Sequence, residues 1–166
     1  MKQVKMLKDA MKNNYIVPAF NFANFEILRG LIDACVETKS PIILQASENA
    51  LNYFGDELMF GIVQGVRKSK LPISMHLDHG KNLDVVKRAI KLGFDSVMID
   101  GSTLPFKENV KLTKKVVAYA HKNNVAVQYW TINDAETMRK LIEMGCDCIM
   151  TDDPVLLKEV LNEYKK

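Results

Sequence analysis

The stretch Ile73-Ser74-Met75-His76-Leu77-Asp78-His79-Gly80 decides how the chain is expected to fold. Its β-branched and apolar residues favour a buried strand, and the glycine that ends it allows the chain to turn sharply. Asp78 and His79 therefore stand where a strand ends and its loop begins, which is the usual place for chemistry in α/β folds. The spacing alone also fits a strand end with solvated polar groups.

Strand and helix patterns alternate along the whole chain. Apolar residues at three- and four-residue spacing predict the helices, and short apolar runs without strict alternation predict strands that are covered on both faces. A lead-in helix and six strand–helix units predict a parallel (βα) barrel-like fold, formed by residues 1–166 as a single domain. The strands are expected at 15–20, 41–46, 73–80, 96–99, 125–131 and 146–151, and the helices at 1–14, 25–38, 56–69, 83–92, 106–122, 133–145 and after Asp153; 47–54 is expected to be a polar connection.

The composition excludes several classes of partner. A net charge of +3 is mild, and no basic stretch carries interleaved aromatic residues, so we expect no nucleic-acid binding. No apolar run approaches the roughly 20 residues of a membrane span, and the first residues lack the apolar core of a signal peptide. We therefore expect a cytoplasmic protein that does not enter a membrane. Three cysteines do not make a disulfide framework.

Several motifs in order resemble the class II (zinc-dependent) fructose-bisphosphate aldolases. His-Leu-Asp-His-Gly at 76–80 resembles the metal-binding motif of that family, and the segments 19–21, 45–48 and 97–102, with the continuation 104–110, resemble the ends of its first, second and fourth strands. The resemblance covers about residues 1–124. It implies a TIM-barrel origin, with Asp78 as the catalytic acid/base and His79 as a zinc ligand.

The rest of the chain, about residues 125–166, resembles the end of glycerophosphodiester phosphodiesterases. Trp-Thr-Ile-Asn at 130–133 and the strand-like segment 146–152 carry this resemblance, with Cys148 where that family usually has glycine. Both families are (βα)₈ barrels. The chain thus looks like four units of one barrel joined to two of another, which suggests an engineered or recombined chimera; a natural enzyme with a divergent tail is the alternative.

Substrate-binding positions follow from the two resemblances. The aldolase resemblance implies that four polar residues line the mouth of the site: Asn21, Ser47, Asp100 and Ser102. Alternatively, each is a strand-end or turn residue with a local hydrogen bond. The phosphodiesterase resemblance implies that Trp130 lines a substrate pocket, whereas its chemistry alone also fits a core or rim aromatic residue.

The metal site that the resemblance implies is incomplete. Class II aldolases bind zinc through three histidines, and only His79 has a counterpart here. His76 shares a strand face with Asp78, so it is either a second ligand or an interior histidine. Cys146 and Cys148 also share a face and are either soft-metal ligands or small buried residues. Three protein ligands are the usual minimum for catalytic zinc, so we expect weak zinc binding and no firm cofactor.

The ligand count favours a folded scaffold without an intact active site as the function. The alternative is a zinc-dependent aldolase-like lyase that acts on a sugar phosphate, with the missing ligands supplied by another subunit. A small-molecule binding module is a second alternative. If the sheet stays open, its unpaired edges invite pairing with another chain, so we expect self-association as a homodimer.

Overall fold

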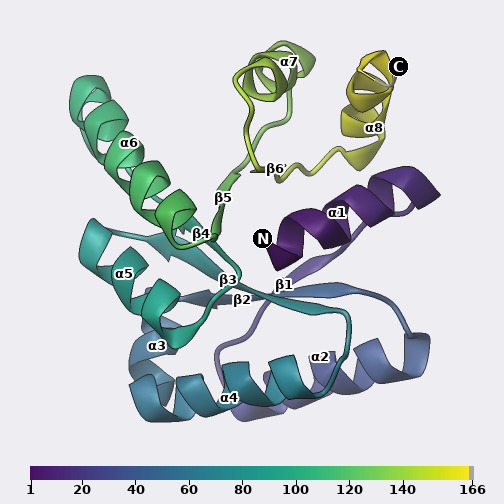
Figure 1. Cartoon of the computed structure of the whole chain (residues 1–166), viewed down its shortest axis with the longest axis vertical. Coiled ribbons are helices and arrows are strands. Elements are labelled where there is room, and N and C mark those ends of the chain that lie inside the picture. Colours follow the sequence, from purple (N-terminus) through teal and green to yellow (C-terminus); the bar gives the residue numbers. More distant parts are fainter. Residues whose placement is uncertain (165–166) are drawn as a thin grey trace. The chain divides into compact units, whose positions relative to one another are not determined.

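The computed structural model describes residues 1–164 and confirms the predicted fold class, because strands and helices alternate and all the strand pairings that it defines are parallel (Figure 1). The chain divides into two compact units, residues 1–126 and 127–166. This boundary lies close to residue 124, where the resemblance to aldolases ends. The prediction of a single domain remains a prediction.

The first unit contains a four-stranded parallel sheet in the order β1-β2-β3-β4. Its strands are β1 (Ala19–Asn21), β2 (Ile42–Ser47), β3 (Ile73–Gly80) and β4 (Ser96–Ile99), and its helices are α1 (Lys2–Asn13), α2 (Phe25–Thr38), α3 (Glu48–Phe54), α4 (Asp56–Lys68), α5 (Leu83–Leu92) and α6 (Phe106–Lys122). The register pairs Ser47 with Asp78. Since the strands are parallel, their carboxyl ends meet at one edge of the sheet, and the polar residues that follow them meet there too.

Strand β3 lies between β2 and β4 and is a buried strand at 73–80, as the sequence predicts. Ile73, Met75 and Leu77 are completely buried and form one face of the strand. The other face carries buried polar residues, of which Ser74 donates a hydrogen bond to Gln3 Oε1 of α1 over 2.8 Å. Helix α1 is therefore attached to the sheet through a buried side chain.

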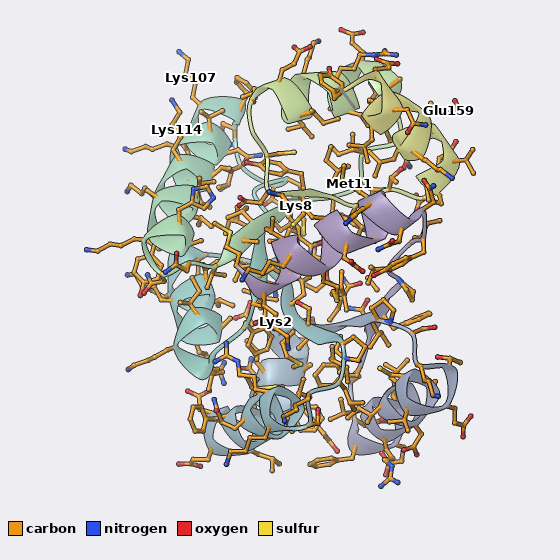
Figure 2. The ribbon with its side chains drawn as sticks, turned by 45° about the vertical axis from the view of Figure 1, so that its right-hand side comes forward. Lys2, Lys8, Met11, Lys107, Lys114 and Glu159 are labelled. Carbon is orange, nitrogen blue, oxygen red and sulfur yellow. The ribbon has the colours of Figure 1, made fainter. Side chains whose placement is uncertain are left out.

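Most of the basic residues that the structure describes lie in helices. In Figure 2, Lys107 and Lys114 extend outward from α6, and Lys8 lies on α1. Lys2, at the start of α1, instead donates a hydrogen bond to the backbone oxygen of Ile73 over 2.6 Å.

Two details of the predicted elements are wrong. Residues 47–54 are not a polar connection, because 48–54 form helix α3, whose N-terminus is capped by Ser47 and which buries Ala50, Leu51 and Phe54. These three apolar residues recur at helical spacing between polar ones, so the polar composition concealed the helix. The strands predicted at 15–20 and 146–151 are shorter and begin later than expected, at Ala19 and Cys148.

The second unit contains one strand pair and two helices. Strand β5 (Ala126–Tyr129), which begins at the boundary, pairs in parallel with β6 (Cys148–Ile149), and the helices are α7 (Ala135–Glu143) and α8 (Pro154–Glu163). Helix α8 begins as the sequence predicts, since the Asp153 side chain accepts a hydrogen bond from the backbone of Leu156 over 2.9 Å. Across residues 1–164, no helix has the length and apolar character that crossing a membrane requires.

Candidate functional site

The end of β3, where the register with β4 shifts between Leu77 and Gly80, places Asp78 and His79 at the carboxyl edge of the sheet. His79 has a φ of 50°, in the left-handed region that side-chain-bearing residues seldom adopt. Gly80 follows, and a Cβ there would lie 2.9 Å from Leu77 Cδ2 and 3.0 Å from the backbone oxygen of Met98. The close packing of β3 against Leu77 and the backbone of Met98 therefore requires glycine at position 80.

His79 is held by a carboxylate from the next strand. Its Nδ1 lies 2.7 Å from Asp100 Oδ2, and the backbone N–H of Ser102 donates to Asp100 Oδ1 over 3.0 Å. The hydrogen bonds from Ser102, and then the one from His79, lower the pKa of Asp100 to about 2. Asp100 is therefore ionised at neutral pH and orients the imidazole through Nδ1, as carboxylates do for histidines that bind metals through the other nitrogen.

Asp78 is held by an amide from the first strand. Asn21 Nδ2 donates to Asp78 Oδ2 over 2.7 Å, across 57 positions of sequence. The other carboxylate oxygen of Asp78 lies 3.9 Å from His79 Nε2. One oxygen is thus fixed by Asn21 while the other stands beside the imidazole, so the structure brings together Asn21, Asp78, His79, Asp100 and Ser102.

Ser47 lies level with Asp78 on the neighbouring strand, but its hydroxyl has a local role. Ser47 Oγ accepts a hydrogen bond from the backbone N–H of Ala50 over 3.3 Å and thereby caps α3. Ser47 therefore makes a local hydrogen bond, which the sequence left open as the alternative to lining the substrate site. Its role in substrate binding remains a prediction.

His76 lies in the interior and not at the edge of the sheet. It is 1% exposed, and its Nδ1 lies 2.7 Å from Ser96 Oγ. Burial lowers its pKa to about 3, so the ring is neutral at physiological pH. This is the arrangement of an interior histidine, and a ligand role for His76 remains a prediction.

The predicted positions of the second unit lie at and beyond the end of β5. Trp130 follows β5 and is 46% exposed, as a rim aromatic residue would be. Burial raises the pKa of the Cys146 thiol and raises that of Cys148 to about 12. Both thiols are therefore protonated at neutral pH, the form that does not bind a metal.

The side chains present do not complete a zinc site. Within residues 1–164 there is no group of three or more histidine, cysteine, aspartate or glutamate side chains close enough to hold a metal ion. His79, supported by Asp100, fits the requirements for a single ligand. A catalytic zinc needs three protein ligands, so the further ones would have to come from outside the described residues.

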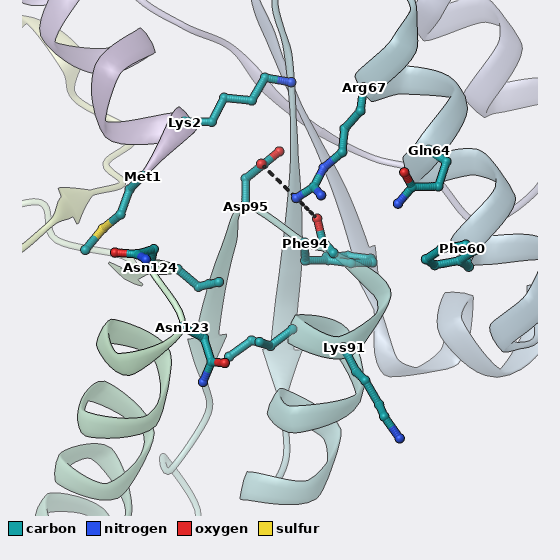
Figure 3. A pocket seen from close by; sticks show the side chains of 13 residues that line it. Met1, Lys2, Phe60, Gln64, Arg67, Lys91, Phe94, Asp95, Asn123 and Asn124 are labelled. Atoms are coloured by element: carbon teal, nitrogen blue, oxygen red, sulfur yellow. Dashed lines mark hydrogen bonds and ion pairs between the residues drawn. The ribbon is translucent and has the colours of Figure 1, made fainter.

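A cavity of the first unit lies at the opposite end of the sheet. Its volume is about 530 Å³, and it is lined in part by Lys2, Arg67 and Asp95 (Figure 3). Asp95 immediately precedes β4, so the cavity is at the amino ends of the strands. Arg67 lies 3.6 Å from Asp95 and donates to the backbone oxygen of Gly93 over 2.6 Å. These contacts bridge α4 to the loop before β4, and they belong to the end of the sheet where (βα) folds place stabilising residues rather than catalytic ones.

Parallel βα units whose strands end in polar side chains at one edge are the arrangement of (βα) barrel folds. The model of the family described as fructose-bisphosphate aldolase class-II matches residues 1–129, and the chain belongs to this family. The fructose-bisphosphate aldolase of Giardia intestinalis is 48% identical over 126 residues, which are 75% of this chain and 39% of that protein. That of Treponema pallidum is 47% identical over 118 residues, which are 68% of this chain and 36% of that protein.

Solved structures agree with this assignment. The YdjI aldolase from Escherichia coli K12 superposes with a TM-score of 0.76 at 27% identity, covering 90% of this chain and 63% of that one. A putative fructose-1,6-biphosphate aldolase from Coccidioides immitis shares the fold with a TM-score of 0.80 at 24% identity, covering 98% of this chain and 67% of that one. The chain spans less than half the length of the curated relatives named above.

These findings correct the expected function. The interpretation as a chimeric scaffold without an active site is wrong, because curated relatives at 41–48% identity are named fructose-bisphosphate aldolases and the family match includes the whole Asp78–His79 cluster. The expected function rested on a count of histidine ligands. That count left out the hydrogen-bonded partners that hold Asp78 and His79 in place. The resemblance of residues 125–166 to phosphodiesterases remains a prediction.

Proposed function

We propose that the chain carries the acid/base part of the active site of a class II aldolase-type lyase, which makes or cleaves a carbon–carbon bond of a sugar phosphate. Two adjacent side chains on β3, each held by a residue of a different strand, support this most directly. Asn21 is hydrogen-bonded to Asp78, and Asp100 is hydrogen-bonded to His79. Family membership supplies the reaction class. The substrate class is inferred from the names of the relatives.

Asp78 has the placement that a general base requires. Cleavage of an aldol needs a base that removes a proton from the hydroxyl group at the reacting carbon and an acid that returns a proton to the new carbanion. With Oδ2 fixed by Asn21, the carboxylate of Asp78 can turn only a little, so Oδ1 is aimed beside His79. A base held in one orientation loses little entropy when the substrate arrives.

His79 would contribute one ligand to a zinc site that is completed elsewhere. Its Nδ1 lies against Asp100, which directs the opposite side of the ring toward Asp78. The remaining ligands would come from a further part of a longer protein or from another subunit. In this arrangement Asn21 and Asp100 act as positioning residues. Ser47 and Ser102, at the ends of neighbouring strands, remain candidates for substrate contacts.

The experiment that tests the proposal uses a full-length relative, because this chain spans under half of one. Residues 1–126 would replace the matching segment of the Giardia intestinalis aldolase, and cleavage of fructose bisphosphate would be followed by coupled reduction of the triose phosphate products. We expect an active hybrid that Asp78→Asn slows by about 10²- to 10⁴-fold, the usual contribution of a general base.

Asp84→Asn is the matched control, because Asp84 lies on α5 with its side chain 90% exposed. It removes the same charge close to the site in sequence and should leave the rate unchanged. A folded hybrid without activity, or an active one that tolerates Asp78→Asn, would contradict the proposal.

A further inference from the structure

The cavity at the amino ends of the strands contains side chains that the proposed reaction does not use (Figure 3). Its volume of about 530 Å³ lies within the range of small-molecule sites. Three cationic side chains, one carboxylate, three amides and the ring of Phe60 are among the groups that line it. All the lining residues belong to the first unit and to the part of the chain that the family match covers.

Helix α4 presents three of these side chains in a row. Phe60, Gln64 and Arg67 are four and three positions apart, so they lie on one face of the helix and line the cavity together. Phe60 is 48% exposed, and the amide of Gln64 can both donate and accept hydrogen bonds. The helical rise separates Phe60 from Arg67 by about 10 Å. An aromatic ring, an amide and a cation therefore follow one another over roughly the length of a nucleoside monophosphate.

Two cations of the cavity are held in place without using all their donors. In Figure 3, Lys2 extends into the cavity from α1 and Arg67 from α4. Lys2 donates to the backbone oxygen of Ile73 over 2.6 Å, and Arg67 Nη2 donates to that of Gly93 over 2.6 Å. An ammonium has three donors and a guanidinium five, and within residues 1–164 neither side chain makes a second hydrogen bond. The Arg67 side chain is 44% exposed, so a ligand can reach the donors that remain.

The carboxylate of the cavity is already compensated. Asp95 Oδ2 accepts from the backbone N–H of Met75 over 3.0 Å, and Oδ1 lies 3.6 Å from Arg67. Asp95 is only 7% exposed, so it presents little of its charge to a ligand. Lys91, which extends away from Arg67 in Figure 3, adds a further positive charge nearby. With Lys2, these groups give the cavity a net positive charge, which attracts an anion.

We propose that this cavity is a second ligand site, which binds a nucleoside phosphate at the end of the sheet opposite the Asp78–His79 cluster. The phosphate lies between Lys2 and Arg67, whose guanidinium matches the geometry of phosphate oxygens. The ribose hydroxyls bond to the amide of Gln64, and the base packs on the ring of Phe60. Stacking on an aromatic ring accepts any base, so the site selects for a nucleotide and not for one particular base.

The test titrates the intact chain with AMP in a calorimeter, with adenosine and inorganic phosphate as separate ligands. We expect one AMP per chain with a dissociation constant of about 1 mM or lower, and binding of adenosine and of phosphate that is at least about tenfold weaker. Phe60→Ala should weaken AMP about tenfold and leave inorganic phosphate unchanged. Arg67→Gln should weaken both about tenfold, because each makes charge-assisted hydrogen bonds to the guanidinium. Equal affinities for AMP and inorganic phosphate would overturn the assignment to a nucleotide.

Lys68→Gln is the matched control, since Lys68 follows Arg67 on α4, is exposed and does not line the cavity. It removes the same charge and should leave the affinity for AMP unchanged. AMP should also raise the thermal midpoint of the wild type and of Lys68→Gln but not of Arg67→Gln. Phe60 is about half exposed, so Phe60→Ala still tests the site if Arg67→Gln unfolds. No binding at about 10 mM AMP, wild-type affinity in both cavity variants, or displacement of AMP by fructose bisphosphate would overturn the proposal.

Discussion

The buried histidine of β3 should make the protein acid-sensitive well above the range in which carboxylates titrate. His76 is 1% exposed, and Ser96 Oγ, which lies 2.7 Å from its Nδ1, also donates to Gln3 Oε1. Burial lowers the pKa of His76 from 6.5 to about 3, and the nearby charge of His79 acts in the same direction. The folded protein therefore keeps this ring neutral in solutions where the unfolded chain protonates it.

The size of the effect follows from the shift in pKa. Below pH 6.5 the unfolded chain binds one proton more than the folded one, so the free energy of unfolding falls by about 1.4 kcal/mol for each pH unit until the pH approaches 3. Between pH 7 and pH 5 the loss is about 2 kcal/mol. The whole shift, from 6.5 to about 3, corresponds to roughly 5 kcal/mol.

Urea unfolding at pH 7 and pH 5 measures this loss. His76→Gln retains a polar side chain that can bond to Ser96 and does not titrate, so this variant should be less stable at pH 7 but should lose about 2 kcal/mol less on acidification than the wild type. His121→Gln, on the exposed surface of α6, should show the wild-type pH dependence. If His76→Gln lost as much stability as the wild type, the assignment of acid sensitivity to His76 would be refuted.

Two further substitutions probe the turn and the support of the site. Gly80→Ala should destabilise the fold by about 1–3 kcal/mol through overpacking, because its Cβ would meet Leu77 and the backbone of Met98. The control Gly65→Ala, in α4 with nothing within 4 Å of the added Cβ, should instead stabilise the fold by up to about 1 kcal/mol. Equal effects of the two substitutions in thermal unfolding would contradict the steric argument. Asp100→Asn should lower stability at pH 7 by at most about 2 kcal/mol, because the pKa of Asp100 is lowered to about 2. The ionised Asp100 stabilises the fold at pH values above 3.8, the pKa in the unfolded chain, and this stabilisation is lost as the pH falls toward 2. The difference in stability between Asp100→Asn and the wild type should therefore shrink by pH 3. A difference in urea midpoints that stays constant with pH would argue against this role of Asp100.

The sequence by itself determined the order of strands and helices and the position of the functional strand end. Hydrophobic periodicity is a local property, and β3 could be located from Ile73–Gly80 alone. Helix α8 was equally local, since Asp153 and Pro154 mark its start. Helix α3 was missed, because only three apolar residues of a short polar segment face the core.

Only the tertiary structure decided how the site is assembled. The contact between Asn21 and Asp78 joins residues 57 positions apart, and that between His79 and Asp100 joins residues 21 positions apart. Such pairs depend on the parallel register, which brings the carboxyl ends of β1, β3 and β4 to one edge. The same register buries His76 beside Ser96, although His76 shares a strand face with Asp78. Spacing along a strand assigns a side chain to a face, but only the neighbouring strands and helix α1 determine whether that position is covered.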